Sequence, residues 1–426
     1  MKTAIFWFRR DLRLTDNTAL NAALKSGAKV LPIFIFDRNI LDDLEKNDAR
    51  VSFIHETLEG LNDQLKKYNS SIQCFYGTPL EIWKSILNTH DISDVFINKD
   101  YEPYAINRDL EVEKLLSEHQ VQLHRFKDQV IFEEHEIVKN DGLPYTVYTP
   151  YKNKWLAAFY NSDFSPTEEV NYNGFARINA EFPSIESIGF NSSEIKVQAY
   201  TYAQISNYED IRDYPETDGT SYLSPHLRFG TVSVRQAIEM NRSNNATFLS
   251  ELIWREFFMQ ILFHYPRVVH SNFKSKYDGI LWRNNEDEFN LWCEGKTGYP
   301  MVDAGMRQLN KTGYMHNRVR MVVSGFLCKH LLIDWKWGEA YFAQKLLDYD
   351  LSANNGNWQW ASGTGCDSAP YFRIFNPIEQ LKKFDKNHVY INTWIEDLQE
   401  LTYPQPMVDH KFARERALLA YKKGLE

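Results

Sequence analysis

Five short apolar runs alternate with segments of helical periodicity over the first 126 residues, and this alternation limits the possible folds more than any other feature. The runs predict strands at Ala4–Phe8, Lys29–Phe36, Ile72–Tyr76, Asp94–Asn98 and Val121–Phe126. Strands that are joined by helices form a parallel sheet with both faces covered. The N-terminal part is therefore predicted to be an α/β domain with a five-stranded parallel sheet. No GxGxxG or Walker sequence follows a strand, so the domain is Rossmann-like in architecture only.

The strand pattern does not return after about residue 198, and helical periodicity runs through the second half of the chain. Between 162 and 197 periodicity fades while Pro, Asn, Ser and Gly accumulate, which is typical of a long surface connection. A chain of 426 residues also exceeds what one hydrophobic core supports. We expect an α/β domain over 1–130, an interdomain linker over 131–197 and an all-α domain over 198–426.

Composition excludes some classes of protein. The net charge of −9 argues against a protein that coats nucleic acid indiscriminately, although a local basic groove remains compatible with it. The four cysteines are far apart and form no CxxC, so we expect no metal site. No apolar segment is long enough to span a bilayer, and the first apolar run is too short for a signal peptide. We expect a cytoplasmic protein without a membrane partner.

Polar and aromatic residues crowd into the 29 residues of Leu347–Phe375, among them Asp348, Asp350, Asn354, Asn355, Trp358, Trp360 and Arg373. Carboxylates and amides are costly to bury without hydrogen-bond partners, whereas Trp side chains are costly to leave in water. A bound, flat ligand with polar edges would satisfy both requirements.

Three further clusters occur in the helical half. Asp218–Ser224 combines Gly with small hydroxyls, as a phosphate site or an ordinary helix N-cap would. Glu251, Trp254 and Arg255 share one helix face; Glu251 is then either a buried carboxylate paired with Arg255 or a group on the wall of a cavity. Met315–Met321 carries an amide and two arginines, which are more often simply solvated. Together the clusters indicate a deep pocket.

Four motifs make these clusters recognisable: ELIWREFF from Glu251, EGKTGYPMVDAGMRQL from Glu294, MHNRVRM from Met315 and LSANNGNWQWASGTGCDSAPYFRIFNP from Leu351. They closely resemble the photolyase/cryptochrome family and, within it, class I cyclobutane pyrimidine dimer photolyases. The resemblance covers essentially the whole chain. It implies that the helical half binds FAD, reduced in the active form, and uses light to transfer an electron to a pyrimidine dimer in UV-damaged DNA.

The resemblance also implies roles for individual residues. The catalytic residues would be Glu251, which hydrogen-bonds the dimer, and Asn354, near flavin N5. The FAD contacts would be Tyr208, Thr220, Ser221, Tyr222, Leu223, Ser224, Arg255, Asn317, Arg320, Asp348, Asp350 and Asn354, with Asp350 paired to Arg320. The dimer and its DNA would contact Arg212, Glu251, Trp254, Asn317, Arg318, Met321, Trp360 and Arg373. Electrons would reach the flavin through Trp358, Trp335 and Trp282, with Trp292 a rival for the outermost position.

A second, antenna chromophore is left open by the sequence. Relatives that hold methenyltetrahydrofolate use an Asn-Glu pair where this chain has Tyr104-Ala105, so the folate ligands are not matched. A deazaflavin, another flavin or no antenna are the alternatives. We expect a monomer. The competing functions are a blue-light cryptochrome, disfavoured by Asn354, and a (6-4) photolyase, for which His316 alone does not make the expected pattern.

Overall fold

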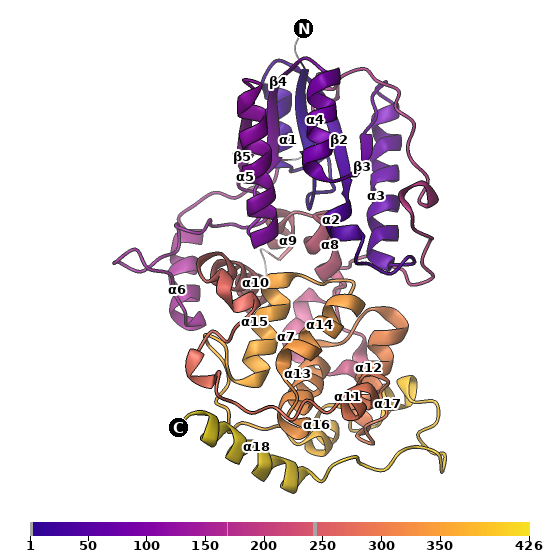
Figure 1. Cartoon of the computed structure of the whole chain (residues 1–426), viewed down its shortest axis with the longest axis vertical. Coiled ribbons are helices and arrows are strands. Elements are labelled where there is room, and N and C mark those ends of the chain that lie inside the picture. The colour runs from indigo at the N-terminus through magenta and orange to yellow at the C-terminus, as the bar shows by residue number, and fades with distance from the viewer. Residues whose placement is uncertain (1–2, 168, 242–244) are drawn as a thin grey trace. The chain divides into compact units, whose positions relative to one another are not determined.

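The computed structural model describes residues 3–167, 169–241 and 245–426, and the chain divides into two compact units. The first unit consists of Met1–Glu136, Trp155–Tyr200 and Tyr222–Ser243. The second consists of Ile137–Lys154, Thr201–Ser221 and Asn244–Glu426. Figure 1 shows the sheet of the first unit in indigo and the helices of the second in pink to yellow. The domain limits expected at 130 and 197 stay predictions.

The first unit is built on one sheet of five parallel strands, as predicted. The strands are β1 (Thr3–Phe8), β2 (Lys29–Asp37), β3 (Gln73–Gly77), β4 (Ile92–Asn98) and β5 (Gln122–Phe126). Their order across the sheet is β3-β2-β1-β4-β5, so the chain reverses its direction of travel at β1. Each strand begins and ends within two residues of its predicted limits, because a buried parallel strand is apolar along its whole length.

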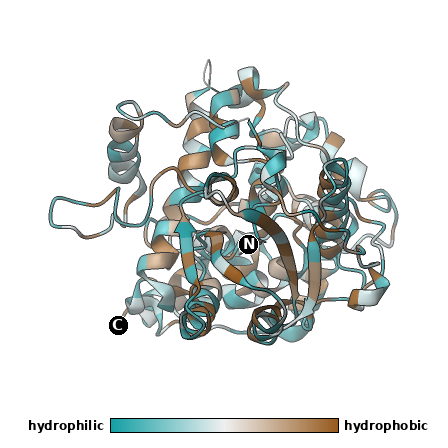
Figure 2. Ribbon diagram, turned by 90° about the horizontal axis from the view of Figure 1, so that it is seen from above, coloured by the Kyte–Doolittle hydropathy of each residue, from teal (hydrophilic) through white to brown (hydrophobic). Residues whose placement is uncertain are grey.

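Both faces of the sheet are covered because successive side chains of a strand point to opposite faces. Phe6 and Phe8 lie in the core formed with α1 (Thr18–Lys25) and α3 (Ala49–Lys66). Ile5 and Trp7 lie in the core formed with α4 (Pro79–Thr89) and α5 (Pro103–Glu118). Figure 2 shows hydrophobic residues along the strands between these helices.

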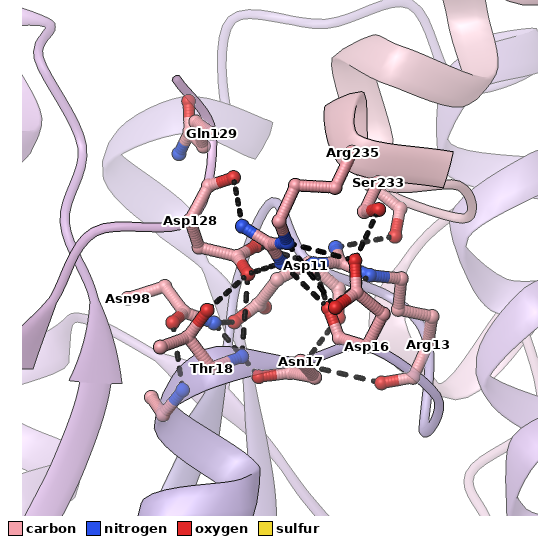
Figure 3. A network of polar contacts seen from close by, with 12 residues as sticks. Asp11, Arg13, Asp16, Asn17, Thr18, Asn98, Asp128, Gln129, Ser233 and Arg235 are labelled. Atoms are coloured by element: carbon pink, nitrogen blue, oxygen red, sulfur yellow. Dashed lines mark hydrogen bonds and ion pairs between the residues drawn. The ribbon is translucent and has the colours of Figure 1, made fainter. Parts of the chain in front are cut away.

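A buried ionic network lies beside the sheet in the first unit (Figure 3). Asp128 accepts hydrogen bonds from Arg13 Nη2 at 2.6 Å, from Arg235 Nη2 at 2.8 Å and from Thr18 Oγ1 at 3.0 Å. Arg235 also donates to both carboxylate oxygens of Asp16, at 3.1 and 2.9 Å. Burial alone would raise the pKa of Asp128, but the guanidinium groups of Arg13 and Arg235 hold it below its usual value. The sequence patterns gave no indication of this network.

The remaining helices of the first unit are short: α2 (Arg38–Leu41), α8 (Leu223–Phe229) and α9 (Val234–Met240). The predicted end of the last of these, at Arg242, lies outside the described residues. Helix α6 (Tyr148–Phe159) lies within the range expected to be a linker. The boundary between the units falls inside α6, since Lys154 belongs to the second unit and Trp155 to the first.

The second unit is helical, as predicted. Its helices are α7 (Tyr208–Ile211), α10 (Ala246–His264), α11 (Glu286–Cys293), α12 (Pro300–Thr312), α13 (Asn317–Gly325), α14 (Trp335–Lys345), α15 (Leu351–Ser362), α16 (Pro377–Phe384), α17 (Val389–Trp394) and α18 (His410–Gly424). The helical periodicity of the sequence predicts one helix over Asn317–His330, but the α-helix ends at Gly325 and a π-helix follows over Phe326–Leu331. Within the described residues, no helix has both the length and the apolar character needed to cross a membrane.

Helix α15 lies at the centre of the second unit, against α10, α13 and α14. Two glycines allow this close packing. A Cβ atom on Gly338 of α14 would come within 2.1 Å of the Trp358 ring, and one on Gly356 of α15 within 2.1 Å of the Phe258 ring. The crowded stretch recognised in the sequence is thus a central helix, with Asp350 as its N-cap.

Candidate functional site

An aromatic wall forms where α10 meets the start of α6. The rings of Trp254 and Tyr148 are stacked, with centroids 3.6 Å apart and an angle of 7° between the planes. The Tyr148 hydroxyl donates to the Ser250 carbonyl at 2.8 Å and contacts the Ser250 hydroxyl at 2.6 Å. Burial raises the pKa of Tyr148, so the phenol is neutral at neutral pH. The orientation of the Trp254 ring is therefore fixed by Tyr148, which is itself hydrogen-bonded to Ser250, the residue before Glu251 on α10.

The Glu251 carboxylate is paired with Arg212, which follows the end of α7. Arg212 Nη1 lies 2.5 Å from Glu251 Oε1, and the two side chains are 23% and 36% exposed. Burial alone would lower the pKa of Arg212, but the Glu251 carboxylate raises it. The Glu251 side chain is therefore partly exposed and paired with Arg212, so it is not a buried carboxylate; its place on the wall of a cavity stays a prediction.

Two more arginines of the predicted site lie on α13. Arg318 Nη2 donates to Asp213 at 2.7 Å, and its guanidinium carbon lies 4.3 Å from the centroid of the Phe384 ring. Arg320 Nη2 donates to Asp348 Oδ2 at 2.9 Å. The predicted pairing of Arg320 with Asp350 is wrong: both Nη atoms of Arg320 donate to Asp348, and its Nε donates to the Met315 backbone carbonyl.

The physical reason is the position of Asp350 at the start of α15. Its carboxylate accepts from the backbone N–H of Ala353 at 3.2 Å and from the Ser352 hydroxyl. An N-cap carboxylate satisfies backbone donors that have no partner within the helix. Asp348, two residues earlier and outside the helix, is left to pair with Arg320.

The Asn354 amide is buried on α15 and held by α14. Its Nδ2 donates to the Glu339 backbone carbonyl at 3.0 Å and to Glu339 Oε1 at 2.9 Å. Burial raises the pKa of Glu339, an effect that the hydrogen bond from Asn354 opposes. Both contacts use the NH₂ group of Asn354, which fixes the orientation of the amide and leaves its Oδ1 without a hydrogen bond among the described residues.

The three predicted relay tryptophans are not arranged as a continuous stack. Trp358 is buried and makes ring contacts with Trp292, at 6.2 Å between centroids, and with Phe342, at 5.0 Å. Trp335 is also buried and donates from Nε1 to Asn272 Oδ1 at 2.9 Å. Trp282 is partly buried, with its ring 5.9 Å from that of Tyr421. The order of the relay stays a prediction.

Three residues predicted to contact DNA surround one small cavity. Met321, Trp360 and Arg373 line it together with Lys329, and its volume is about 10 Å³. The Arg373 side chain is exposed, and its guanidinium carbon lies 5.4 Å from the centroid of the Phe375 ring. Asn317, the first residue of α13, is exposed as well.

The predicted phosphate segment crosses the boundary between the units: Thr220 and Ser221 belong to the second, Tyr222, Leu223 and Ser224 to the first. Asp218 and Tyr222 both have a left-handed backbone, with φ of 43° and 52°. Such a conformation is uncommon outside glycine and gathers at ligand-binding sites. Tyr208 opens α7 and contacts Phe248 edge to face, while Arg255 lies on α10.

Sequence reasoning missed three residues of the site: Tyr148, Asp213 and Glu339. Tyr148 lies 106 residues before the tryptophan it stacks on, in the range taken for a linker. Asp213 follows Arg212 directly but was not singled out as a partner for Arg318. Glu339 lies one turn after Trp335 on α14. In a sequence, an acidic residue in a helix is usually interpreted as exposed to solvent. Only the fold brings these groups to their partners.

The chain was compared with known proteins. Residues 4–171 match the family described as DNA photolyase, and residues 248–402 match the FAD binding domain of DNA photolyase. The deoxyribodipyrimidine photo-lyase of Vibrio cholerae is 36% identical, over 98% of this chain and 99% of that protein.

Two crystal structures are similar over their whole length. A class III photolyase of Agrobacterium tumefaciens has a TM-score of 0.89 and 32% identity, covering 100% of this chain and 98% of that one. An archaeal photolyase of Sulfolobus tokodaii has a TM-score of 0.86 and 34% identity, covering 99% of each chain. With such identity over nearly its full length, the chain belongs to the DNA photolyase family.

Proposed function

We propose that this chain is a deoxyribodipyrimidine photo-lyase of class I, which splits cyclobutane pyrimidine dimers in DNA when illuminated. One observation carries the proposal: the accessible Glu251 carboxylate lies on the same helix face as the stacked Trp254. A damaged base that leaves the duplex needs a flat apolar surface and a polar group at its edge. Glu251 and Trp254 supply these two features side by side.

The residues present fit a flavin. Asn354 offers an acceptor oxygen, Oδ1, of fixed orientation, because Glu339 engages both donors of its NH₂ group. Arg320 and Asp348 supply a partly exposed pair of opposite charges beside α15. FAD would be held by these residues together with Tyr208, Thr220–Ser224, Arg255, Asn317 and Asp350. When bound and reduced, FAD supplies an excitable electron donor for the dimer.

The protein's own groups then act on the dimer. Trp254 and Trp360 form apolar walls, and the Glu251 carboxyl group, once it takes up a proton, donates a hydrogen bond to the pyrimidine oxygen where negative charge develops. A single group placed in this way contributes about 2.7–4 kcal/mol to catalysis in other enzymes. Arg212 orients the Glu251 carboxylate through their 2.5 Å contact. Asn317 and Met321 line the rest of the pocket, and Arg318 and Arg373 contact phosphates.

Photoreduction of the flavin would use Trp358, on α15 beside Asn354, followed by Trp335 and Trp282. Supporting this order, Gly338 brings α14 against the Trp358 ring one turn after Trp335. Trp292 stays a competitor because it contacts the Trp358 ring directly.

The second chromophore is not a folate in this proposal. Tyr104, where the folate relatives have Asn, donates to Asp37 Oδ2 at 2.5 Å and is fixed in place. The Sulfolobus tokodaii structure is described as holding two FAD molecules, with the implication of a novel light-harvesting cofactor. Another flavin is therefore the first alternative to test here, followed by a deazaflavin and by no antenna. We further propose a cytoplasmic monomer whose partner is UV-damaged DNA.

The test is repair of oligo(dT) containing thymine dimers, by purified protein, in blue light and in the dark. We expect unmodified thymines to return in light only. An unchanged dimer content after illumination of protein whose flavin is reduced would overturn the proposal. The absorption spectrum before and after denaturation identifies the bound chromophores independently of repair.

A further inference from the structure

Lys329 is a buried cation that the proposed repair does not use. It lies in the π-helix after α13, and its side chain is 2% exposed. Its ammonium group has three donors, of which one is used, by the Arg373 backbone carbonyl at 3.2 Å. The group lines the small cavity whose other walls include Trp360 and Arg373. The volume of about 10 Å³ is close to the space that one ordered water needs.

No carboxylate neutralises Lys329 within the described part of the chain. Its neighbour from the loop before α16 is Arg373, a second cation, and its neighbour from α18 is Tyr421, whose ring centroid lies 5.9 Å from Nζ. On its own helix, burial raises the pKa of Cys328 and lowers that of His330 to about 3, so both are neutral. An ammonium ion buried in this way is costly unless an anion compensates it.

The compensating anion is identified by the position of the cavity. Met321, Trp360 and Arg373 were assigned to the lesion and its backbone on independent grounds, and the cavity lies among them. We propose that Lys329 is a buried cation that supports DNA binding by the surface that Met321, Trp360 and Arg373 form around this cavity. As an ammonium ion it fixes the backbone of Arg373 and, through one water in the cavity, adds a second positive charge for a phosphodiester oxygen that Arg373 contacts. This inference rests on the proposed function.

The position of Lys329 makes DNA binding depend on pH. Burial lowers its pKa to about 8; the Cys328 thiol opposes this effect and Arg373 adds to it. The group is charged below that pH, so the affinity for DNA is high there and falls as the pH rises through about 8. Bound phosphate favours the charged form and shifts the fall to a somewhat higher pH.

The experiment measures dark binding of a single-stranded oligo(dT) with one thymine dimer, by fluorescence anisotropy at constant ionic strength between pH 6.5 and 9.5. The wild-type holoprotein should lose about threefold to tenfold in affinity over this range, as expected for one charge-assisted contact through water. Lys329→Arg should retain its affinity throughout, since a guanidinium stays protonated. Lys329→Met should bind more weakly than the wild type at pH 7, and its affinity should not fall further as the pH rises. The slope of log affinity against log salt concentration should be smaller in magnitude by up to about one.

Lys422→Met is the matched control, because Lys422 is exposed on α18; it should follow the wild type. A fall in affinity that is the same in Lys329→Arg as in the wild type would overturn the inference. If Lys329→Met does not fold, as judged by circular dichroism, the comparison of Lys329→Arg with the wild type decides alone. A wild type that binds damaged and undamaged oligo(dT) equally at pH 7 would instead contradict the proposed function.

Discussion

The two compact units bury charge in opposite ways. In the first unit, Asp128 lies between Arg13 and Arg235, and the side chains of Asp128 and Arg13 are 1% and 5% exposed. In the second unit, Glu251 and Arg212 form a partly exposed pair, and Lys329 is buried with no carboxylate partner among the residues that the structure describes. In the network of the first unit, the charged side chains donate to and accept from one another. Groups that keep spare capacity are the ones able to receive a ligand.

From this contrast we propose a structural role for the network of the first unit and a binding role for Glu251, Arg212 and Lys329 of the second. It separates two kinds of charged residue that look alike in a sequence. The predictions below test the contrast by removing one member of each arrangement.

The largest effect is expected for Asp128→Asn in the first unit. The substitution leaves the guanidinium groups of Arg13 and Arg235 buried without their shared carboxylate, which should destabilise the fold by about 3–5 kcal/mol. Denaturant unfolding of the full chain measures the loss. Asp42→Asn is the control, because Asp42 pairs with Arg38 at the surface with both side chains about half exposed; its effect should stay below about 1 kcal/mol. An equal loss of unfolding free energy in Asp128→Asn and Asp42→Asn would show that the buried network has no special structural role.

The same network predicts a dependence of stability on pH. The folded pKa of Asp128 is lowered, so its contribution to stability is present above the unfolded pKa of about 3.9 and is lost as the pH falls through the folded value. Acid should therefore destabilise the wild type more than Asp128→Asn below about pH 4. Parallel stability curves of the two proteins at low pH would contradict this assignment.

A smaller effect is expected for Trp254→Ala in the second unit. Stacking on an aromatic side chain contributes about 1–3 kcal/mol per base, so the affinity for dimer-containing oligo(dT) in the dark should fall by about tenfold or more. Phe412→Ala removes an exposed aromatic ring on α18 and should leave the affinity unchanged. An unaltered affinity of Trp254→Ala would exclude Trp254 from the binding wall.

The smallest effect is expected for Tyr148→Phe. The ring stays stacked on Trp254, and only the hydrogen bond to Ser250 is lost. The binding free energy for dimer-containing oligo(dT) should therefore weaken by about 1 kcal/mol or less. Tyr148→Ala removes the stack as well and should approach the effect of Trp254→Ala. Identical binding by both Tyr148 variants and the wild type would show that Trp254 needs no support from α6.

Much of the fold follows from the sequence because apolar periodicity is local. The five strands and the helix faces of the second half are visible in runs of five to nineteen residues. The π-helix at Phe326–Leu331 was not visible, since its residues continue the helical pattern of α13. Some of the residues assigned by resemblance lie on three helices, with Glu251, Trp254 and Arg255 on α10, Asn317–Met321 on α13, and Asn354, Trp358 and Trp360 on α15. The roles of all the assigned residues stay predictions.

The partners of the site residues were harder to predict. Arg320 had two carboxylates within reach, and the choice of Asp348 depends on Asp350 being taken as the N-cap of α15. Glu339 and Tyr148 reach Asn354 and Trp254 only through the packing of separate helices. No pattern in one segment encodes such a contact.

The role of Glu251 is tested by comparing Glu251→Ala with the wild type in both binding and repair. We expect the variant to bind dimer-containing oligo(dT) in the dark within about twofold of the wild type, because Trp254 and the arginines remain. Repair per absorbed photon should fall by up to about 100-fold, because the hydrogen bond where charge develops is lost. Glu286→Ala, an exposed position on α11, should change neither. An unchanged repair yield in Glu251→Ala would contradict the central claim.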